Sequence, residues 1–316
     1  MPVVLHMEPR TPPMSWKEFC TSKPAYSIAI DGYVSTATLF DEEGPRLNLN
    51  HHEDCDRLAT RATCAQALMY ARQGLADGFR LPNGRVQMDV FANDCDQDVC
   101  TAYFVLDQCP LAEMVFNPRL NRLVHAEDMM DSTAGAYPFP IDAQILRELA
   151  WVFQPYTNFR LSGGLARRDS HEFESIVRDV LLRIKEHIVS GGHEIDLSIA
   201  YDVIGGGDGW EMVREYGAQA RTAMFARGTK AFVSVQDRPD GTKTYSVGRM
   251  SPLIRSFRIP QILTALNQAE GCVGTDMWGG GNTIGGSPRV SGSRLAPDEV
   301  ARIINERIAH TRGILS

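Results

Sequence analysis

Four clusters of carboxylate and imidazole side chains divide the first 131 residues, and each cluster follows a short apolar segment. We predict that these segments are strands, at residues 26–30, 46–49, 86–92 and 122–130. Patterns typical of helices follow two of the clusters, at residues 59–74 and 99–108. The repeated order of strand, polar cluster and helix is typical of α/β folds, in which the carboxyl ends of parallel strands share one edge. It therefore predicts a Rossmann-like, mainly parallel sheet with helices on both faces.

The rest of the chain changes character twice. Residues 141–188 carry a helical pattern that the glycine-containing segment 162–170 interrupts. Beyond residue 191 we predict three strands and a last helix, at residues 195–204, 230–237, 243–250 and 297–311. The predicted organisation is a metal-binding domain over residues 1–140, a helical connector over 141–190 and a smaller α/β substrate domain over 191–316.

The composition agrees with an ordinary globular protein. The 316 residues are 43% hydrophobic and 22% charged, and the chain exceeds the roughly 100–200 residues of one usual domain. No apolar run approaches the roughly 20 residues that span a bilayer, and the first residues lack a basic and an apolar region. The seven cysteines include no Cys-x-x-Cys pair, which argues against disulfides and structural zinc. We expect a cytoplasmic protein without a membrane partner.

The negative charge lies in the first half of the chain. Residues 1–140 carry 11 Lys and Arg against 19 Asp and Glu, whereas the remainder carries 21 against 20. Such a surface repels long duplex nucleic acid, which binds to basic surfaces. The excess of acid is explained either by a solvated surface or by carboxylates that surround cations. We expect a small substrate as the partner, and the charge pattern leaves a homodimer open.

The four polar clusters contain candidate metal ligands. They are Asp31, then His51 and His52, then Asp94, Asp96 and Asp98, and last Asp131. Mixed oxygen and nitrogen donors suit a divalent ion such as manganese, iron or zinc. A single aspartate at a strand-to-helix turn is more often a helix cap than a ligand. The prediction of a metal site therefore rests on all four clusters meeting at one edge.

Several of these segments resemble motifs of the DHH phosphoesterases. Asn50-His51-His52, followed by an Ala- and Thr-containing helix start at Ala59, resembles the Asp-His-His motif of that family. The strand that ends at Asp31, the Asp96-Gln97-Asp98 segment and the segment from Asp131 to Tyr137 are similar to three further motifs. The Asp-x-Asp segment follows the His-His segment here, whereas the family has the opposite order.

The C-terminal half extends the resemblance. The segment from Gly285 to Gly292 is similar to the glycine-rich stretch of the DHH-associated substrate domain. The resemblance implies that Gly285, Gly286, Ser287 and Arg289 bind a phosphate, because glycine admits close approach and the planar guanidinium pairs with phosphoryl oxygens.

The resemblance also implies an activity. Two divalent ions, most simply Mn²⁺ with Fe, Zn or Mg as alternatives, would activate water for attack on a small phosphoester. The implied substrates are a short oligonucleotide, a phosphorylated nucleotide or a cyclic dinucleotide. The implied ligands are Asp31, His52, Asp94, Asp96, Asp98 and Asp131. His51 would act beside the metals as a proton donor or hydrogen-bonding group, and Asp98 is also assigned to catalysis.

Three departures from the family leave other functions open. Asn50 replaces the leading Asp, Ala92 stands where a motif His is expected, and Ser287 replaces the His of the glycine-rich stretch. A protein that binds a phosphorylated ligand without turnover is one alternative, and a metal-dependent enzyme of other chemistry is another. Thiol catalysis by Cys95 or Cys100 is disfavoured, because neighbouring carboxylates raise a thiol pKa.

Overall fold

The computed structural model describes residues 3–109, 111 and 116–311 and divides into two compact units. The N-terminal unit comprises Met1–Ser132 and Gln144–Asp196, and the C-terminal unit comprises Thr133–Ala143 and Leu197–Ser316. Each unit contains one β-sheet with packed helices, which confirms the predicted two-part α/β class. Within the described residues, no helix combines the length and apolar character needed to cross a bilayer.

The N-terminal unit contains a five-stranded sheet in the order β1-β5-β2-β4-β3. Neighbouring strands run parallel except β3, which is antiparallel to β4 at the edge, so the sheet is mainly parallel as predicted. The strands are β1 (Val3–Met7), β2 (Ser27–Ile30), β3 (Leu39–Asp41), β4 (Arg46–Leu49) and β5 (Met88–Ala92). Strand β1 is additional to the predicted strands and pairs with β5 along its whole length.

The register of the central strands aligns their carboxyl ends. Ile30 at the end of β2 pairs with Leu49 at the end of β4, and Ala29 pairs with Phe91 of β5. Because these strands are parallel, the residues that follow them emerge at one edge of the sheet. The register therefore brings three of the four predicted polar clusters to the same edge.

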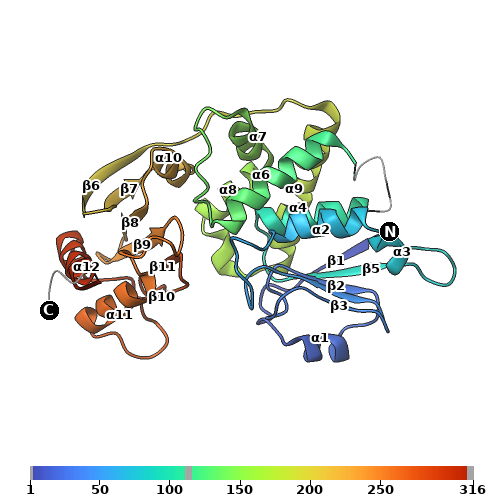
Figure 1. Ribbon diagram of the computed structural model, residues 1–316, viewed down its shortest axis with the longest axis horizontal. Helices are drawn as coiled ribbons and strands as arrows, with labels where there is room; N and C mark the ends of the chain where they lie inside the picture. The colour runs from blue at the N-terminus through green and yellow to red at the C-terminus, as the bar shows by residue number, and fades with distance from the viewer. Residues whose placement is uncertain (1–2, 110, 112–115, 312–316) are drawn as a thin grey trace. The chain divides into compact units, whose positions relative to one another are not determined.

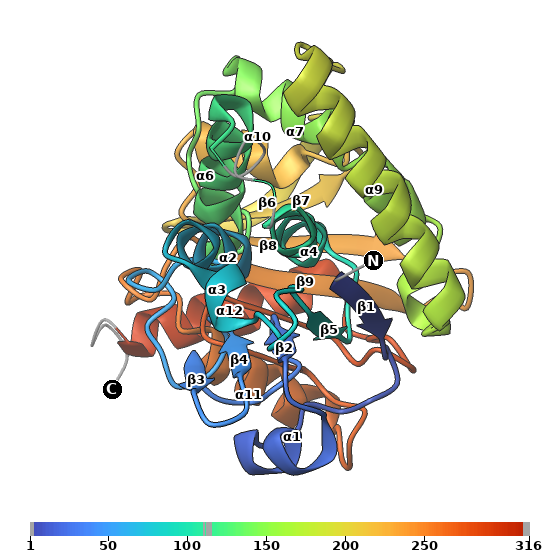
Figure 2. The same ribbon diagram turned by 90° about the vertical axis from the view of Figure 1, so that its right-hand side faces the viewer.

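Helices cover both faces of this sheet, as Figures 1 and 2 show. Helix α1 (Trp16–Ser22) packs Phe19 against Ala29 and Phe91 on one face. Helices α2 (Thr63–Arg72) and α4 (Gln97–Gln108) lie on the opposite face and pack against each other. Successive strand residues point to opposite faces, so the mostly apolar strands β2 and β5 supply both cores.

Residues 122–130 form a helix, so the predicted strand there is wrong. They belong to α6 (Pro118–Ser132), which packs on α2 and α4. The segment has apolar residues at Leu123, Val124 and Ala126, a short run that fits a buried strand and a buried helix equally well. Asp131 therefore belongs to the last turn of a helix and does not follow a strand.

The segment predicted as a connector packs on the N-terminal unit. Its helices contact α4, α6 and β1, and all but the first residues of 141–190 belong to that unit. The elements are α7 (Gln144–Val152), α8 (Gln154–Leu161), a 3₁₀ turn (Gly164–Arg167) and α9 (Ser170–Ser190), with α3 (Leu75–Gly78) following α2 elsewhere in the unit. The amphipathic pattern is thus explained by packing against the sheet domain.

The C-terminal unit contains a six-stranded sheet in the order β10-β11-β9-β8-β7-β6, in which only β7 and β8 are parallel neighbours. The strands are β6 (Tyr201–Gly207), β7 (Trp210–Glu215), β8 (Ala231–Asp237), β9 (Lys243–Arg249), β10 (Gly279–Gly280) and β11 (Ile284–Gly286). Helix α10 (Ala220–Ala226) packs Phe225 on Phe232 at one face. Helices α11 (Ile259–Glu270) and α12 (Pro297–Thr311) cover Val233 and Val235 at the other face.

Paired strands β1 and β5 provide a matched test of the sheet core. Val90 of β5 is fully buried, whereas Val4 of β1 is 45% exposed. We expect Val90→Ala to lower the free energy of unfolding by about 2 kcal/mol, because it removes buried methyl groups and leaves a cavity. The same substitution at Val4 should cost less than about 0.5 kcal/mol. Urea denaturation of both variants measures the difference, and equal losses would contradict the assigned burial.

Candidate metal centre

Four of the predicted ligands, together with His51, which was predicted as a catalytic group, converge at the carboxyl edge of the N-terminal sheet. Asp31 follows β2, His51 and His52 follow β4, Asp98 lies in the first turn of α4, and Asp131 ends α6. Ligand atoms within 4.8 Å of one another form two groups, Asp31 with His51 and His52, and His51 with Asp98 and Asp131. These groups could hold a metal ion, because carboxylate oxygens and imidazole nitrogens are ligands of divalent metals.

His51 lies at the centre of the cluster. Its side chain is fully buried, and Nε2 lies 2.8 Å from Asp131 Oδ2, 3.4 Å from Asp31 Oδ1 and 3.7 Å from Asp98 Oδ2. Within the described residues, neither ring nitrogen has a hydrogen-bond partner of acceptable geometry. Burial lowers the pKa of His51, but the carboxylates of Asp131 and Asp31 outweigh it and raise the pKa to about 10. A buried nitrogen without a directed partner among three carboxylates fits a metal ligand.

Asp31 adopts a left-handed backbone conformation, with φ of +53°. Aspartate tolerates this region better than most residues. Its Oδ1 accepts hydrogen bonds from His52 Nε2 at 2.8 Å and from the Thr63 hydroxyl at 3.1 Å. Burial raises its pKa, but His51 and His52 outweigh that effect and hold the pKa well below its usual range. Asp31 is therefore an ionised carboxylate fixed by its neighbours.

Asp98 joins the cluster to the start of α2. Its carboxylate accepts the backbone N–H groups of Thr63 at 2.8 Å and Cys64 at 2.7 Å. Burial and the carboxylates of Asp131 and Asp31 raise its pKa to about 7. The residue therefore caps a helix as well as facing His51, and its loss would disturb α2 in addition to the cluster.

Asp131 is fixed by a residue that the sequence analysis missed. Arg57 donates from one guanidinium nitrogen to the Asp131 carbonyl oxygen at 2.8 Å and to its Oδ2 at 3.1 Å. Glu127 was missed as well, because its segment was predicted as a strand. It is buried on α6, its Oε2 has no partner among the described residues, and burial together with Asp131 and Asp98 raises its pKa. Residues four positions apart lie on the same face of a helix, so Glu127 and Asp131 would have been recognised as neighbours if the segment had been predicted as a helix.

The structure does not bring Asp94 and Asp96 into either group of ligand atoms within the described residues. Asp96 is the N-cap of α4 and accepts the N–H of Val99 at 2.9 Å, which is the helix-cap alternative stated above. Asp94 accepts the N–H of Cys95 at 2.7 Å. Burial and the charge of Asp31 raise the pKa of Asp96. Both residues are near the cluster but use their carboxylates on the local backbone.

The residues that differ from the DHH pattern have structural partners here. The Asn50 amide donates to the carbonyl oxygens of Val34 and Thr36, at 3.2 and 2.7 Å, and to Glu53 Oε2 at 2.7 Å. Its Oδ1 accepts the His52 N–H at 3.1 Å. Asn50 therefore shapes the loop that carries His51 and His52. All seven cysteines are free, and burial, followed by the charges of neighbouring aspartates, raises the pKa of Cys95, which agrees with the rejection of thiol catalysis.

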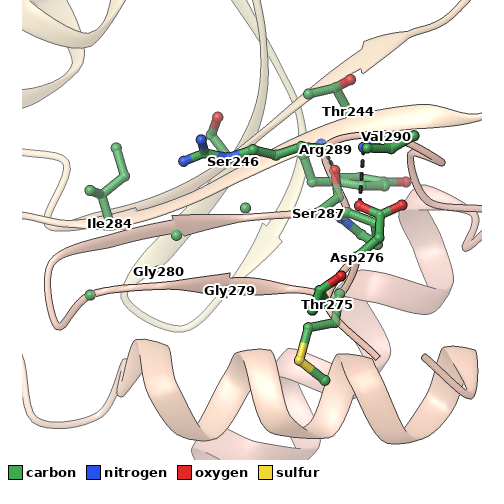
Figure 3. A pocket seen from close by; sticks show the side chains of 16 residues that line it. Thr244, Ser246, Thr275, Asp276, Gly279, Gly280, Ile284, Ser287, Arg289 and Val290 are labelled. Carbon is green, nitrogen blue, oxygen red and sulfur yellow. Dashed lines mark hydrogen bonds between the residues drawn. The ribbon is translucent and has the colours of Figure 1, made fainter. Parts of the chain in front are cut away.

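The predicted phosphate-binding residues of the C-terminal unit line a groove of about 990 Å³, shown in Figure 3. Arg289 is exposed, and its side chain extends alongside β9 toward Ser246. Ser287 is buried, and its hydroxyl accepts the N–H of Tyr245 at 3.0 Å. The groove therefore offers Arg289 to a ligand, whereas Ser287 attaches the loop to β9.

The glycines of this groove also have a packing requirement. A Cβ atom on Gly285 would lie 2.7 Å from Leu263 and 2.9 Å from the Gly279 carbonyl oxygen. A Cβ atom on Gly286 would lie 2.7 Å from the Tyr245 carbonyl oxygen. Close pairing of β9, β10 and β11 therefore requires glycine at these positions, whether or not a ligand binds.

Comparisons with known proteins add no assignment. A scan against protein-family models finds no match, and no curated protein matches the chain.

The charge of the cluster predicts a proton release. The pKa of His51 is about 10 and that of Asp98 about 7, so at pH 7 the free site carries a proton on His51. A divalent cation binds only the deprotonated ring nitrogen, so binding of Mn²⁺ should release about one proton or more and strengthen from pH 6 to pH 8. Titration calorimetry in buffers of different ionisation enthalpy measures the release.

The matched control is His125→Gln, which removes an exposed histidine of α6 and should leave the release unchanged. His51→Gln should abolish it. A binding heat that is independent of buffer in the unsubstituted protein would rule out His51 as a ligand.

Proposed function

We propose that this protein is a divalent-metal-dependent phosphoesterase that hydrolyses a small phosphoester. The observation that carries the proposal is the fully buried His51, whose Nε2 lies among three carboxylates without a directed hydrogen bond. A metal ion would give this nitrogen a partner and neutralise the crowded carboxylates. When bound, such an ion polarises a phosphoryl oxygen and makes hydroxide available at neutral pH. The resemblance of the motifs to DHH phosphoesterases agrees with the same reaction.

The two neighbouring histidines differ in exposure, and this difference suggests their roles. The His51 side chain is 0% exposed, whereas that of His52 is 32% exposed. A group that donates a proton to a leaving oxygen must reach the substrate. We therefore exchange the roles expected from the sequence and assign His51 to metal binding. His52, oriented by the 2.8 Å contact with Asp31, is the proton donor in this proposal.

The proposed metal is manganese, in one or two equivalents. Asp31, Asp98 and Asp131 would hold it together with His51. The two ligand groups share His51, and its single Nε2 can ligate one ion, so a second ion would depend on the carboxylates. Mn²⁺ and Fe²⁺ bind to carboxylate and imidazole donors, whereas a site made of thiolates would favour other metals.

We propose that Arg289 binds a phosphoryl group in the groove of the C-terminal unit. No carboxylate lies within 4.0 Å of the Arg289 guanidinium among the described residues, so the charge is available to an anion. Guanidinium groups bind phosphoryl oxygens through two parallel hydrogen bonds. The acidic first 140 residues disfavour long nucleic acid. A nucleotide or a short oligonucleotide fits both observations.

A second candidate function is ligand binding without turnover, and Asn50 favours it. The amide at this position is fully used in shaping the loop, whereas the family motif has a carboxylate there. A loss of one anionic ligand lowers metal affinity. Metal content with and without turnover distinguishes the two functions.

The central test combines metal analysis with an activity screen. The purified protein should contain or take up about one to two equivalents of Mn²⁺ and hydrolyse one of the tested substrates. The expected products are inorganic phosphate from a nucleotide and nucleoside monophosphates or a linear dinucleotide from short oligonucleotides or cyclic dinucleotides. Asp31→Asn should remove the metal and lower activity at least about a hundredfold. The fold should survive, because asparagine tolerates the left-handed conformation of residue 31.

Asp89→Asn is the matched control. Asp89 lies on β5 and contacts His6 at 2.8 Å, and it belongs to neither ligand group within the described residues. The variant should keep its metal and its activity. Metal retained in Asp31→Asn would refute the site, and metal without turnover of any substrate would favour the binding function.

The groove of the C-terminal unit has its own prediction. Arg289→Ala should raise KM for the phosphorylated substrate at least about tenfold, because one bidentate contact is worth roughly 1.5–3 kcal/mol. Metal content should not change. The matched control is Arg294→Ala, an exposed arginine that does not line the groove, and steady-state kinetics compare the two variants. Equal kinetics for both variants would contradict phosphate binding by Arg289.

A further inference from the structure

Arg57 places a positive charge directly against the candidate metal centre. One of its guanidinium nitrogens donates to the Asp131 carbonyl oxygen at 2.8 Å and to Asp131 Oδ2 at 3.1 Å. The same Oδ2 lies 2.8 Å from His51 Nε2. Within the described part of the chain, no other lysine or arginine pairs with a member of the two ligand groups. Among these residues, Arg57 is therefore the permanent cation of the cluster.

A turn in the loop between β4 and α2 holds Arg57 in this position. Asp56 Oδ1 accepts the N–H of Leu58 at 3.0 Å, and the Asp56 carbonyl oxygen accepts the N–H of Thr60 at 2.8 Å. Helix α2, which follows this loop, packs on α6, and the last turn of α6 carries Asp131 (Figure 1). The local turn and the packing of the two helices together fix the guanidinium group beside the carboxylate.

Hydrogen bonds alone do not account for the position of this guanidinium group. Its Nε is buried and has no hydrogen-bond partner among the described residues. A buried donor without a partner destabilises the folded state, and the effect is larger for a charged group. The neighbouring carboxylates offset this loss, because they attract the positive charge. The charge of Arg57 is thus the property that suits it to this place.

Arg57 lies on the accessible side of the cluster. The side chains of Arg57, His52 and Asp131 are 30%, 32% and 23% exposed, whereas the other members of the cluster are at most 4% exposed. Burial lowers the pKa of His52, Asp31 raises it above its usual value, and the nearby charge of Arg57 opposes that rise. A phosphoester that reaches the metal ligands therefore approaches them past His52 and Arg57.

The ligand set suits one divalent ion. Both ligand groups contain His51, and one ring nitrogen can ligate one ion. One divalent ion together with Arg57 would balance the negative charges of Asp31, Asp98 and Asp131. A second ion on Asp131 would lie beside the guanidinium group, and like charges in partly buried surroundings repel each other strongly. The residues present thus favour one ion beside an arginine over two ions.

We infer that the centre holds a single divalent ion and that Arg57 supplies, in place of a second ion, positive charge to the phosphoryl oxygens of the substrate. The inference rests on the proposed function and specifies how its centre is built. Arginine suits this position, because its guanidinium group keeps its charge and presents several N–H donors in one plane. A guanidinium group fixed in advance stabilises charge that develops on phosphoryl oxygens, which is a role that the second ion has in two-metal sites.

The first part of the test measures metal binding without substrate. Metal-free protein is titrated with Mn²⁺, and free and bound ions are measured by electron paramagnetic resonance. We expect one equivalent to bind, with the spectrum of an isolated ion rather than of a coupled pair. Arg57→Gln should bind Mn²⁺ at least about fivefold more tightly, because it removes a like charge beside the ligands. Arg57→Lys keeps the charge and should bind Mn²⁺ as the unsubstituted protein does.

The second part measures turnover of two chromogenic probes, p-nitrophenyl phosphate and bis(p-nitrophenyl) phosphate, with Mn²⁺ present. Arg57→Gln should lower kcat at least about a hundredfold for the ester that is hydrolysed, and Arg57→Lys should lower it less. Arg61→Gln is the matched control. Arg61 lies in the same loop, is 58% exposed and comes no closer than 4.0 Å to Asp128, so its loss should change neither Mn²⁺ affinity nor kcat.

The outcomes separate the inference from the proposed function. Two bound equivalents, a coupled-pair spectrum, weaker Mn²⁺ binding by Arg57→Gln or an unchanged kcat would each overturn the inference, and hydrolysis of either ester would leave the phosphoesterase intact. Weaker binding is the result expected if Arg57 only orients Asp131. Thermal unfolding checks that each variant is folded, and the metal count of the unsubstituted protein depends on no variant.

Absence of turnover has two distinct readings. One bound equivalent and tighter binding by Arg57→Gln, without hydrolysis of either ester, would support the single ion beside Arg57 and overturn the phosphoesterase. Neither Mn²⁺ binding nor turnover would overturn both.

Discussion

The N-terminus of α2 depends on carboxylates from two other helices. Its N-cap is Ala62, which has no side-chain oxygen to accept the first N–H groups. Asp128 of α6 accepts the N–H of Ala62 at 2.7 Å, and Asp98 of α4 accepts those of Thr63 and Cys64. The positive end of the helix dipole favours both negative charges. Asp98 also faces His51. The packing of α2, α4 and α6 and the assembly of the candidate metal centre therefore depend on the same carboxylate.

The same arrangement places the carboxylates of Asp31, Asp98 and Asp131 close together, and the two histidines do not offset all of their mutual repulsion. Asp31 is held ionised by two histidines, whereas burial and neighbouring carboxylates raise the pKa of Asp98 to about 7. Ionised Asp31 raises the free energy of unfolding at pH values above the ordinary carboxyl pKa. Asp98 acts in the opposite direction: its protonated form stabilises the folded state at low pH, and this contribution is lost as the pH rises through about 7. A bound cation would remove this conflict, since it favours the ionised form of both groups.

Much of the fold around the site was predictable from local patterns. The strands before Asp31 and His51, the strand before Asp98 and the final helix lie where the sequence predicts them. The strand predicted at 122–130 is helix α6, because a short apolar run does not distinguish a buried strand from a buried helix. Strand β1 was missed, since only its pairing with β5 identifies it. Asp131 still reaches His51, but through the end of a helix.

The sequence by itself determined which chemical groups are available and, through strands that end in polar residues, that Asp31, His51, His52 and Asp98 share one edge of a parallel sheet. Tertiary structure decided which of the acids face His51 and which serve the backbone. Asp96 is two residues from Asp98 in the sequence. Nevertheless, Asp96 caps α4, whereas Asp98 caps α2. The direction of each carboxylate depends on which unpaired N–H groups lie nearby. Those groups are supplied by packing between elements far apart in the chain, which no local pattern encodes.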